Sequence, residues 1–373
     1  MTFSPGPGRG FPSPASSLGG PGPKICVVII AFDRREYLAE AVGSVLRQSI
    51  PRSDYELLVL KNFGEPGLEE FLRREGIPQD RPESVAQGAW VAGALTRSHA
   101  PLFAFLDDDD LFFPDKLGAA LGAFELDPQL GYFHHGCAVF GGGTGPGGGP
   151  PPPPVRAGAA LGPIRLGPSG DRPRAGARAF SRGAAFNLSS IVVRREVLEA
   201  NLRWLRESIL GVPAFLFYAA WVSGRAIAHT PAVHSRYRLH RSNASASGDR
   251  QRTVRWAHLR RLAETRVHDA DLILTMLRER GLDPVLGAPV ETARSRELLM
   301  LASTDPSATR VDVLRATVRL ARSSVLQGLR ASAPYLWIGL FRMVSRRCSW
   351  RWLGVDRPGL ATGSTSVDRR PDG

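Results

Sequence analysis

Four consecutive aspartates, Asp107 to Asp110, directly follow an apolar run at residues 101–106. The apolar run predicts a buried strand, so the carboxylates are expected at one edge of a sheet. Adjacent carboxylates repel one another, and a cation bound between them relieves that repulsion. Mg²⁺ and Mn²⁺ prefer oxygen ligands and commonly bridge carboxylates to phosphate oxygens. The run therefore indicates either a site for a divalent cation with a phosphate-containing ligand, or a solvated acidic turn that caps the next helix.

The elements that must position these aspartates alternate between strands and helices. Residues 24–32 form a near-continuous β-branched run, which is typical of a parallel strand buried on both faces. Apolar residues at helical spacing follow it, and the same alternation continues to about residue 140. The pattern predicts an α/β fold with a mostly parallel sheet flanked by helices. Ligands of such sheets bind at the carboxyl ends of the strands, where the aspartates are expected.

Composition divides the chain into four parts. Residues 1–23 are rich in Gly, Pro and Ser and predict a flexible leader, and residues 24–245 predict the α/β domain. Within that domain, the Gly- and Pro-rich stretch at 141–181 predicts a flexible insertion. Residues 246–353 predict a helical extension, and 354–373 a flexible tail.

The net charge of +13 comes almost entirely from arginines scattered along the chain. A nucleic-acid interface would gather basic residues into a stripe with interleaved aromatics, so we expect no nucleic-acid partner. The three cysteines, Cys26, Cys137 and Cys348, make neither a disulfide framework nor a zinc pattern. We expect a cytoplasmic protein.

The C-terminal segment at residues 335–353 combines an apolar stretch with arginines and tryptophans. Its apolar stretch is shorter than the roughly 18–20 residues that span a bilayer. Two interpretations remain open: an interfacial helix at the inner membrane surface, or a terminal helix docked on the core or on a second subunit. The first predicts peripheral membrane contact through 335–353.

Four segments in this order resemble the family 2 glycosyltransferases of the GT-A fold. They are Val27-Val-Ile-Ile-Ala-Phe-Asp33, Glu40-Ala-Val-Gly-Ser-Val-Leu-Arg-Gln48, Phe105 to Leu117 with the aspartates, and Tyr237-Arg-Leu-His-Arg-Ser-Asn-Ala-Ser245. The variant Val59-Leu-Lys-Asn-Phe63 is similar to a less common branch of that family. The resemblance covers roughly residues 24–245, and it implies transfer of a sugar from a nucleotide-sugar to a saccharide or glycolipid acceptor, with cell-surface polysaccharide assembly as a typical setting.

The resemblance also implies roles for individual residues. Those implied to bind the donor are Ala31, Phe32, Asp33, Arg35, Asn62, Asp107, Asp108 and Arg238. Asp33 could instead be a plain helix N-cap. The aspartate run matches the family's DXD motif, which implies that Asp109, with Asp107 and His240, holds a divalent Mg²⁺ or Mn²⁺. Such an ion would neutralise charge on the nucleoside diphosphate leaving group. Lys116 is expected on a helix surface.

The general base is the part of the resemblance that does not match. Inverting transfer needs a carboxylate to remove the acceptor's hydroxyl proton. The family usually places it at the start of a helix that here begins Gly211-Val-Pro213, and proline cannot accept a proton. Glu207 is the nearest acid and the candidate base. The alternatives are another acid or a substrate group, or a catalytically degenerate relative that binds a nucleotide-sugar or acts as a scaffold.

Overall fold

The computed structural model describes residues 22–141, 156–157, 162–167, 173–240, 252–305 and 307–325, with 332, 335–336 and 339–340. The chain divides into two compact units, each described here by itself. Unit 1 comprises residues 1–244 and 268–291, and unit 2 comprises residues 245–267 and 292–373. The expected leader, the tail and most of the 335–353 segment lie outside the described residues.

Unit 1 contains most of the regular structure. Its strands are β1 (Ile25–Ala31), β2 (Tyr55–Lys61), β3 (Gln79–Asp80), β4 (Leu102–Asp107), β5 (Leu111–Phe112), β6 (Leu130–Gly141), β7 (Arg156–Ala157), β8 (Ile164–Leu166), β9 (Ile191–Arg194) and β10 (Ala226–Leu239). Its helices are α1 (Leu38–Leu46), α2 (Pro66–Arg74), α3 (Gln87–Arg97), α4 (Lys116–Leu126), α5 (Pro173–Ser181), α6 (Arg195–Ala200), α7 (Leu202–Leu205) and α8 (Val212–Val222). Helices α9 (Arg252–Glu279) and α10 (Pro284–Thr304) contribute to both units.

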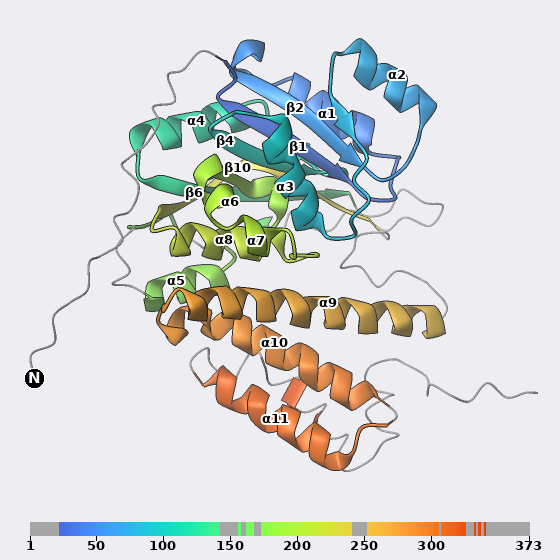
Figure 1. Ribbon diagram of the computed structural model, residues 1–373, viewed down its shortest axis with the longest axis vertical. Coiled ribbons are helices and arrows are strands. Elements are labelled where there is room, and N and C mark those ends of the chain that lie inside the picture. The colour runs from blue at the N-terminus through green and yellow to red at the C-terminus, as the bar shows by residue number, and fades with distance from the viewer. Residues whose placement is uncertain are drawn as a thin grey trace, which may run out of the picture. The chain divides into compact units, whose positions relative to one another are not determined.

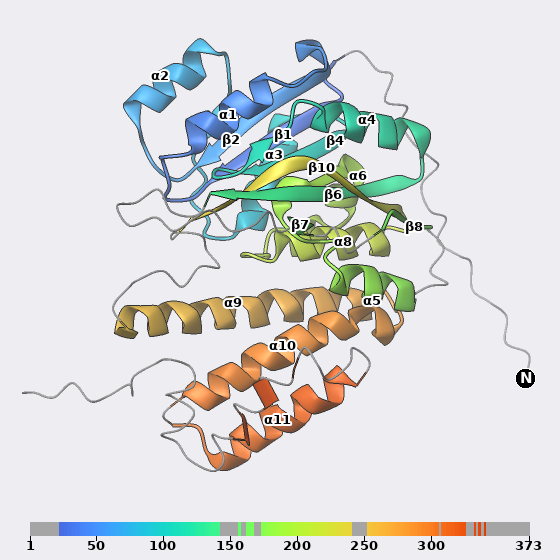
Figure 2. The same ribbon diagram turned by 180° about the vertical axis from the view of Figure 1, so that it is seen from behind.

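The strands described in unit 1 form one sheet in the order β3-β2-β1-β4-β9-β6-β10-β5, with β7 beside β6 and β8 beside β10 (Figure 2). Strands β3, β2, β1 and β4 run parallel, as the sequence predicts. Strand β9 is antiparallel to both β4 and β6, so the sheet as a whole is mixed. The predicted α/β class with helices flanking the sheet is confirmed, and the mostly parallel sheet is interrupted by antiparallel strands such as β9.

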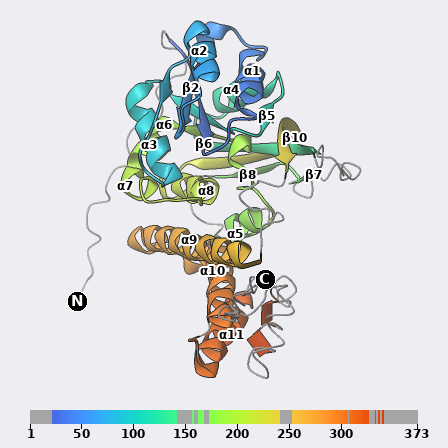
Figure 3. The same cartoon turned by 90° about the vertical axis from the view of Figure 1, so that its right-hand side faces the viewer.

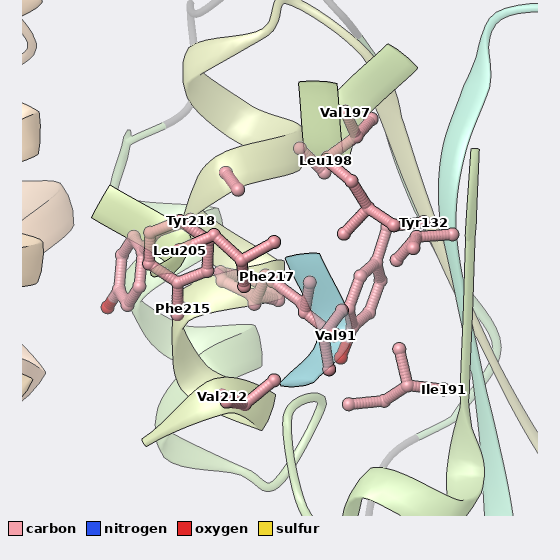
Figure 4. Close-up of a cluster of buried hydrophobic side chains, with 14 of the residues drawn as sticks. Val91, Tyr132, Ile191, Val197, Leu198, Leu205, Val212, Phe215, Phe217 and Tyr218 are labelled. Carbon is pink, nitrogen blue, oxygen red and sulfur yellow. The ribbon is translucent and has the colours of Figure 1, made fainter. Parts of the chain in front are cut away.

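Helices cover both faces of the sheet (Figures 1 and 3). Alternate residues of β1 point to opposite faces of the sheet. Val28 belongs to the apolar cluster that contains residues of α3 and α8. Val27 belongs to the cluster that contains residues of α1, α2 and α4. This two-sided burial is the reason that β1 reads as an unbroken apolar run. Figure 4 shows part of the first cluster, where Tyr132 meets Phe217 edge-on with ring centroids 5.8 Å apart. The two apolar layers hold the strand ends in fixed positions.

Three elements of regular structure, β7, β8 and α5, fall inside the stretch expected to be a flexible insertion. Strand β8 pairs with β10, and α5 buries Gly176, Ala177 and Ala179 against its surroundings. A Cβ added at Gly176 would lie 2.6 Å from the Trp221 ring, so close packing requires the glycine. The expectation of flexibility is wrong for these elements, because small residues pack a helix as effectively as they form a linker.

Unit 2 contains parts of α9 and α10 together with α11 (Arg310–Ser324). Leu299 of α10 packs with Val313 and Leu320 of α11 in a small apolar cluster. Thr309 begins α11 with a capping box, in which it exchanges hydrogen bonds with Asp312. Among the described residues, no helix is both long and apolar enough to cross a membrane.

Candidate functional site

The aspartate run lies where β4 ends, at the carboxyl edge of the parallel part of the sheet. Asp107 is the last residue of β4, and Asp108 donates its backbone N–H to the carbonyl of Ile30 in β1. Side chains of Asp108, Asp109 and Asp110 are buried rather than solvated. Burial raises the pKa of Asp108 and of Asp110 to about 7, and it also raises the pKa of Asp107 well above its usual range. The burial of these side chains excludes the interpretation as a solvated acidic turn. The raised pKa values indicate that too little positive charge surrounds the carboxylates.

Arg34 supplies part of that charge. Its guanidinium contacts Asp108 Oδ1 and Asp109 Oδ2, both at 2.5 Å, and lies 3.0 Å from His240 Nε2. Burial alone would lower the pKa of Arg34, but the carboxylates of Asp108 and Asp109 outweigh it and raise that pKa. The second oxygen of Asp108 is buried and has no hydrogen-bond partner among the described residues. One arginine thus leaves the cluster incompletely neutralised.

The long strand β10 brings two further residues to the aspartates. Strand β5, directly after the aspartate run, pairs antiparallel with β10 and fixes its register. Beyond the end of β10, His240 Nε2 lies 2.8 Å from Asp109 Oδ2. Arg238 donates from Nε to the carbonyl of Asp109 and from its guanidinium to Glu40 of α1. The Tyr237 to His240 segment and the aspartates are therefore neighbours, as the resemblance implies.

Two residues beneath the site hold its framework. Asp110 accepts hydrogen bonds from the Arg238 backbone N–H at 2.9 Å and from the Asn187 amide at 3.0 Å. Lys116 is fully buried, and its Nζ donates to the Ser189 carbonyl at 2.5 Å. The expected surface position of Lys116 is wrong, because α4 begins directly under the aspartates. Burial lowers the pKa of Lys116, although Asp110 and Asp107 oppose that effect.

The turn after β1 faces the end of β2. Asn62 donates from its amide to Asp33 Oδ1 and accepts from the Asp33 backbone N–H, both at 2.8 Å. Asp33 has a φ of 57°, in the left-handed region, and α1 begins only at Leu38. Asp33 is therefore not the N-cap of α1, which corrects that expectation. The neighbouring residue, Lys61, has a buried side chain that pairs with Glu69. Of Lys61 and Asn62, it is therefore Asn62 that contacts Asp33.

The other residues expected to bind the donor surround this turn. Ala31 is buried, and its carbonyl accepts from the Asn62 N–H at 3.3 Å. Phe32 is 48% exposed beside Trp90, with ring centroids 5.8 Å apart. Arg35 lies over the Phe63 ring, 5.5 Å from its centroid. The structure therefore collects Ala31, Phe32, Asp33, Arg35 and Asn62 at the ends of two adjacent strands.

Glu207, the candidate base, lies elsewhere in unit 1. It lines a surface hollow of about 380 Å³ together with Trp204, His268 and Asp271. Its backbone carbonyl lies 3.1 Å from His268 Nε2. No hydrogen bond or ion pair described for the chain joins Glu207 to the aspartate run. The structure thus does not bring the candidate base into contact with the aspartates.

A different carboxylate lies at the start of α8. Asp269 of α9 is buried and accepts hydrogen bonds from the backbone N–H groups of Ile209, Leu210 and Gly211, at 2.7–2.9 Å. A Cβ added at Gly211 would lie 2.9 Å from the Asp269 Cβ, so the glycine permits this close approach. Asp269 therefore reaches Gly211 from a distant part of the sequence and binds the backbone N–H groups that directly precede α8.

The sequence did not identify the roles of Arg34, Lys116 and Asp269. Arg34 directly follows a candidate donor-binding residue, and Lys116 follows the aspartates, so both carried a positional signal. Asp269 carried none, because its partners lie about 60 residues away in the chain. Long-range contacts of this kind follow from the packing of α9 and not from any local pattern.

Comparisons with known proteins identify glycosyltransferases as similar to this chain. Residues 26–142 match the model of glycosyl transferase family 2. Glycosyltransferase AglE of Haloferax volcanii is 29% identical over 93 residues, which cover 23% of this chain and 31% of AglE. The putative teichuronic acid biosynthesis glycosyltransferase TuaG of Bacillus subtilis is 32% identical over 101 residues, which cover 26% of this chain and 39% of TuaG. The chain thus spans about a third of the length of these curated relatives.

Two solved structures show a more distant likeness. S. aureus TarS 1-349 in complex with UDP-GlcNAc is 13% identical, with a TM-score of 0.47 and coverage of 89% of this chain and 92% of that one. Mannosyltransferase PcManGT of Pyrobaculum calidifontis, in complex with GDP-Man and Mn²⁺, is 15% identical, with a TM-score of 0.49 and coverage of 89% and 88%. The segment at residues 26–142, which carries the Asp33 turn and the aspartate run, is thus similar to glycosyl transferase family 2.

Proposed function

We propose that this protein is a metal-dependent, inverting glycosyltransferase that moves a sugar from a nucleotide-sugar to a saccharide or lipid-linked acceptor. One observation carries the proposal: the Asp33–Asn62 pair, Arg34 and the buried aspartates all lie at the carboxyl ends of parallel strands β1, β2 and β4. Ligands of α/β sheets bind at that edge. The name of the relative TuaG, which refers to teichuronic acid biosynthesis, supports cell-surface polysaccharide assembly as the setting. We propose the cytoplasm, at the inner membrane surface, as its location.

The proposed donor site has two ends with different chemistry. At one end, the Asp33–Asn62 pair offers polar groups beside the half-exposed ring of Phe32, which suits a ribose and a flat base. Arg35 and the carbonyl of Ala31 border the same turn. At the other end, Arg34 and Arg238 offer guanidinium groups to the diphosphate. Asp107 and Asp108 lie between these ends.

The donor set fits a divalent cation. Carboxylate oxygens suit Mg²⁺ and Mn²⁺, and the buried Asp108 Oδ2 has no hydrogen-bond partner among the described residues. We assign Asp109, with Asp107 and His240, to hold the ion. The described residues contain no group of three side chains placed to ligate a metal, so diphosphate oxygens would complete the coordination. When bound, the ion would neutralise charge on the leaving diphosphate.

Calorimetry with UDP and GDP, with and without Mn²⁺, tests the site. We expect metal-dependent binding that Asp109→Asn abolishes. Asp115→Asn is the matched control, because the Asp115 side chain lies in the same segment but is 64% exposed. Loss of binding in the control alone, or binding that ignores Mn²⁺, contradicts the proposal.

The transfer step needs a proton acceptor. We propose Glu207 as this base, which requires the acceptor hydroxyl group to reach the hollow that Glu207 lines. A donor-hydrolysis assay should show turnover that Glu207→Gln reduces at least about 100-fold, the usual contribution of general base catalysis. Unchanged turnover in that variant eliminates Glu207 as the base.

A second candidate function is nucleotide-sugar binding without turnover. It is favoured by Pro213 and by Asp269, whose two oxygens are already engaged by three backbone N–H groups. Metal-dependent nucleotide binding without hydrolysis of any donor would support this candidate over the enzyme.

A further inference from the structure

Helix α11 carries an exposed apolar stripe that its own packing does not use. The buried residues of the helix are Val313, Thr317, Leu320 and Ser324. Of these, Val313 and Leu320 pack with Leu299 of α10. The stripe lies on another face of the helix and consists of Val311, Leu314, Val318 and Val325, which are 46–71% exposed. These four residues are spaced 3, 4 and 7 apart, so they share one side of the helix.

An arginine row runs beside the stripe. At 3.6 residues per turn, Arg315, Arg319 and Arg322 lie next to the stripe on the side away from the buried face. All three are exposed. Helix α11 contains four arginines and one aspartate. That aspartate, Asp312, is engaged in the capping box with Thr309 and lies 3.9 Å from the Arg315 guanidinium, so Arg319 and Arg322 carry most of the charge of the row. The outer surface of α11 is thus apolar along one line and strongly cationic along the next.

We propose that this face of α11 binds an anionic lipid surface, with the stripe inserted at the acyl boundary and the arginine row against the headgroups. A helix with an apolar side and an adjacent row of arginines is suited to lie in the plane of a membrane interface. Each arginine near an anionic leaflet contributes about 1 kcal/mol of attraction. The arginine row therefore adds binding energy to that of the apolar stripe. The proposal does not depend on the proposed sugar transfer.

A second copy of this chain fits the face less well. Four aliphatic side chains cover far less than the roughly 800 Å² per partner that a stable protein interface buries. Two stripes packed together would also bring the two arginine rows close, and like charges repel. Negatively charged lipid supplies the complementary charge that a second copy does not.

Vesicle flotation with the full chain tests the proposal. We expect binding to phosphatidylcholine vesicles that contain phosphatidylglycerol, weak binding to phosphatidylcholine alone, and weaker binding at high salt. The double change Leu314→Glu with Val318→Glu should abolish flotation. The double change Arg319→Gln with Arg322→Gln should weaken it on the order of tenfold.

Matched controls separate these effects from general changes of the surface. Leu126→Glu alters an 89% exposed leucine of α4, and Arg73→Gln with Arg74→Gln removes two exposed charges from α2. Both controls should float like the wild type. Circular dichroism verifies that every variant is folded, and nucleotide calorimetry should be the same for all of them, so failure here is distinct from failure of the donor site.

Three results would overturn the proposal. The first is a wild-type chain that does not float with phosphatidylglycerol vesicles. The second is flotation that the two α11 double variants leave unchanged. The third is a vesicle-free change of molecular mass caused by Leu314→Glu with Val318→Glu, which would assign the stripe to self-association.

Discussion

At the scale of single residues, the site is governed by a shortage of positive charge around buried carboxylates. Asp108 and Asp110 have pKa values raised to about 7 by burial, although Arg34 counteracts this at Asp108. Arg34 pairs with Asp108 and with Asp109, and Asp109 is a carboxylate that we assign to the divalent cation. Arg34 and the metal ion are thus expected to compete until a diphosphate provides the arginine with another partner.

Replacing Arg34 by alanine tests this competition. Without nucleotide, Arg34→Ala should bind Mn²⁺ more tightly and should melt at a lower temperature when metal is absent. Two unit charges 4 Å apart interact by about 1–4 kcal/mol near a protein surface, which corresponds to roughly tenfold or more in affinity. Paramagnetic resonance of free Mn²⁺ measures the affinity. Arg35→Ala is the control, because Arg35 lies over Phe63. Weaker Mn²⁺ binding in Arg34→Ala would show that the arginine supports the metal instead.

At the scale of elements, two contacts join segments that are distant in the sequence. Asp269 of α9 binds the backbone N–H groups directly before α8. The Nδ1 atom of His134 in β6 lies 2.7 Å from the Nδ1 atom of His229 in β10. His134 Nε2 lies 2.8 Å from the carbonyl of Phe186, which precedes the Asn187 that supports Asp110. Both contacts therefore stabilise elements that position the site without belonging to it.

The contact between Asp269 and the backbone before α8 is expected to contribute strongly to stability. Asp269→Ala removes the acceptor of three backbone N–H groups at once and should lower the free energy of unfolding by about 2–4 kcal/mol. Asp283→Ala is the matched control, since Asp283 is exposed and accepts from the N–H of Val285. Its cost should stay below about 1 kcal/mol. Urea unfolding measures both, and equal losses would contradict the assignment.

The buried His134 gives a pH dependence of stability. Burial lowers its pKa from 6.5 to about 3, so the folded state favours the neutral ring. The stability from this group is complete above pH 6.5 and is lost as the pH falls, by about 1.4 kcal/mol per pH unit. Wild type should therefore lose about 2 kcal/mol more than His134→Gln between pH 7.5 and 5.

Urea unfolding at both pH values measures the difference between wild type and His134→Gln. This comparison also cancels the opposite trend of Asp108 and Asp110, whose raised pKa values favour the folded state at low pH. His99→Gln, at an exposed position, should behave like the wild type. Parallel pH profiles for wild type and His134→Gln would refute this account of the histidine pair.

At the scale of the whole molecule, the described donor site is built from residues of unit 1, whereas unit 2 has its own small apolar cluster. Leu320→Ala should destabilise unit 2 by about 2–5 kcal/mol, because Leu320 is fully buried. Hydrogen exchange should then speed up in α11 but not in β1, and nucleotide affinity should not change. Leu314→Ala, at a 47% exposed position, should cost less than about 0.5 kcal/mol. A loss of nucleotide affinity in Leu320→Ala would show that the site depends on unit 2.

The sequence by itself determined the α/β class, the strand that delivers the aspartates and the turn that carries Asp33. Those features are local, since hydrophobic periodicity and charge spacing are written in consecutive residues. It did not determine that β9 runs antiparallel, that α5 is ordered or that Lys116 is buried. Those features depend on which surfaces meet. Only the tertiary structure placed Arg34 between two carboxylates and Glu207 in a separate hollow, because packing over long sequence separations decides which charges become neighbours.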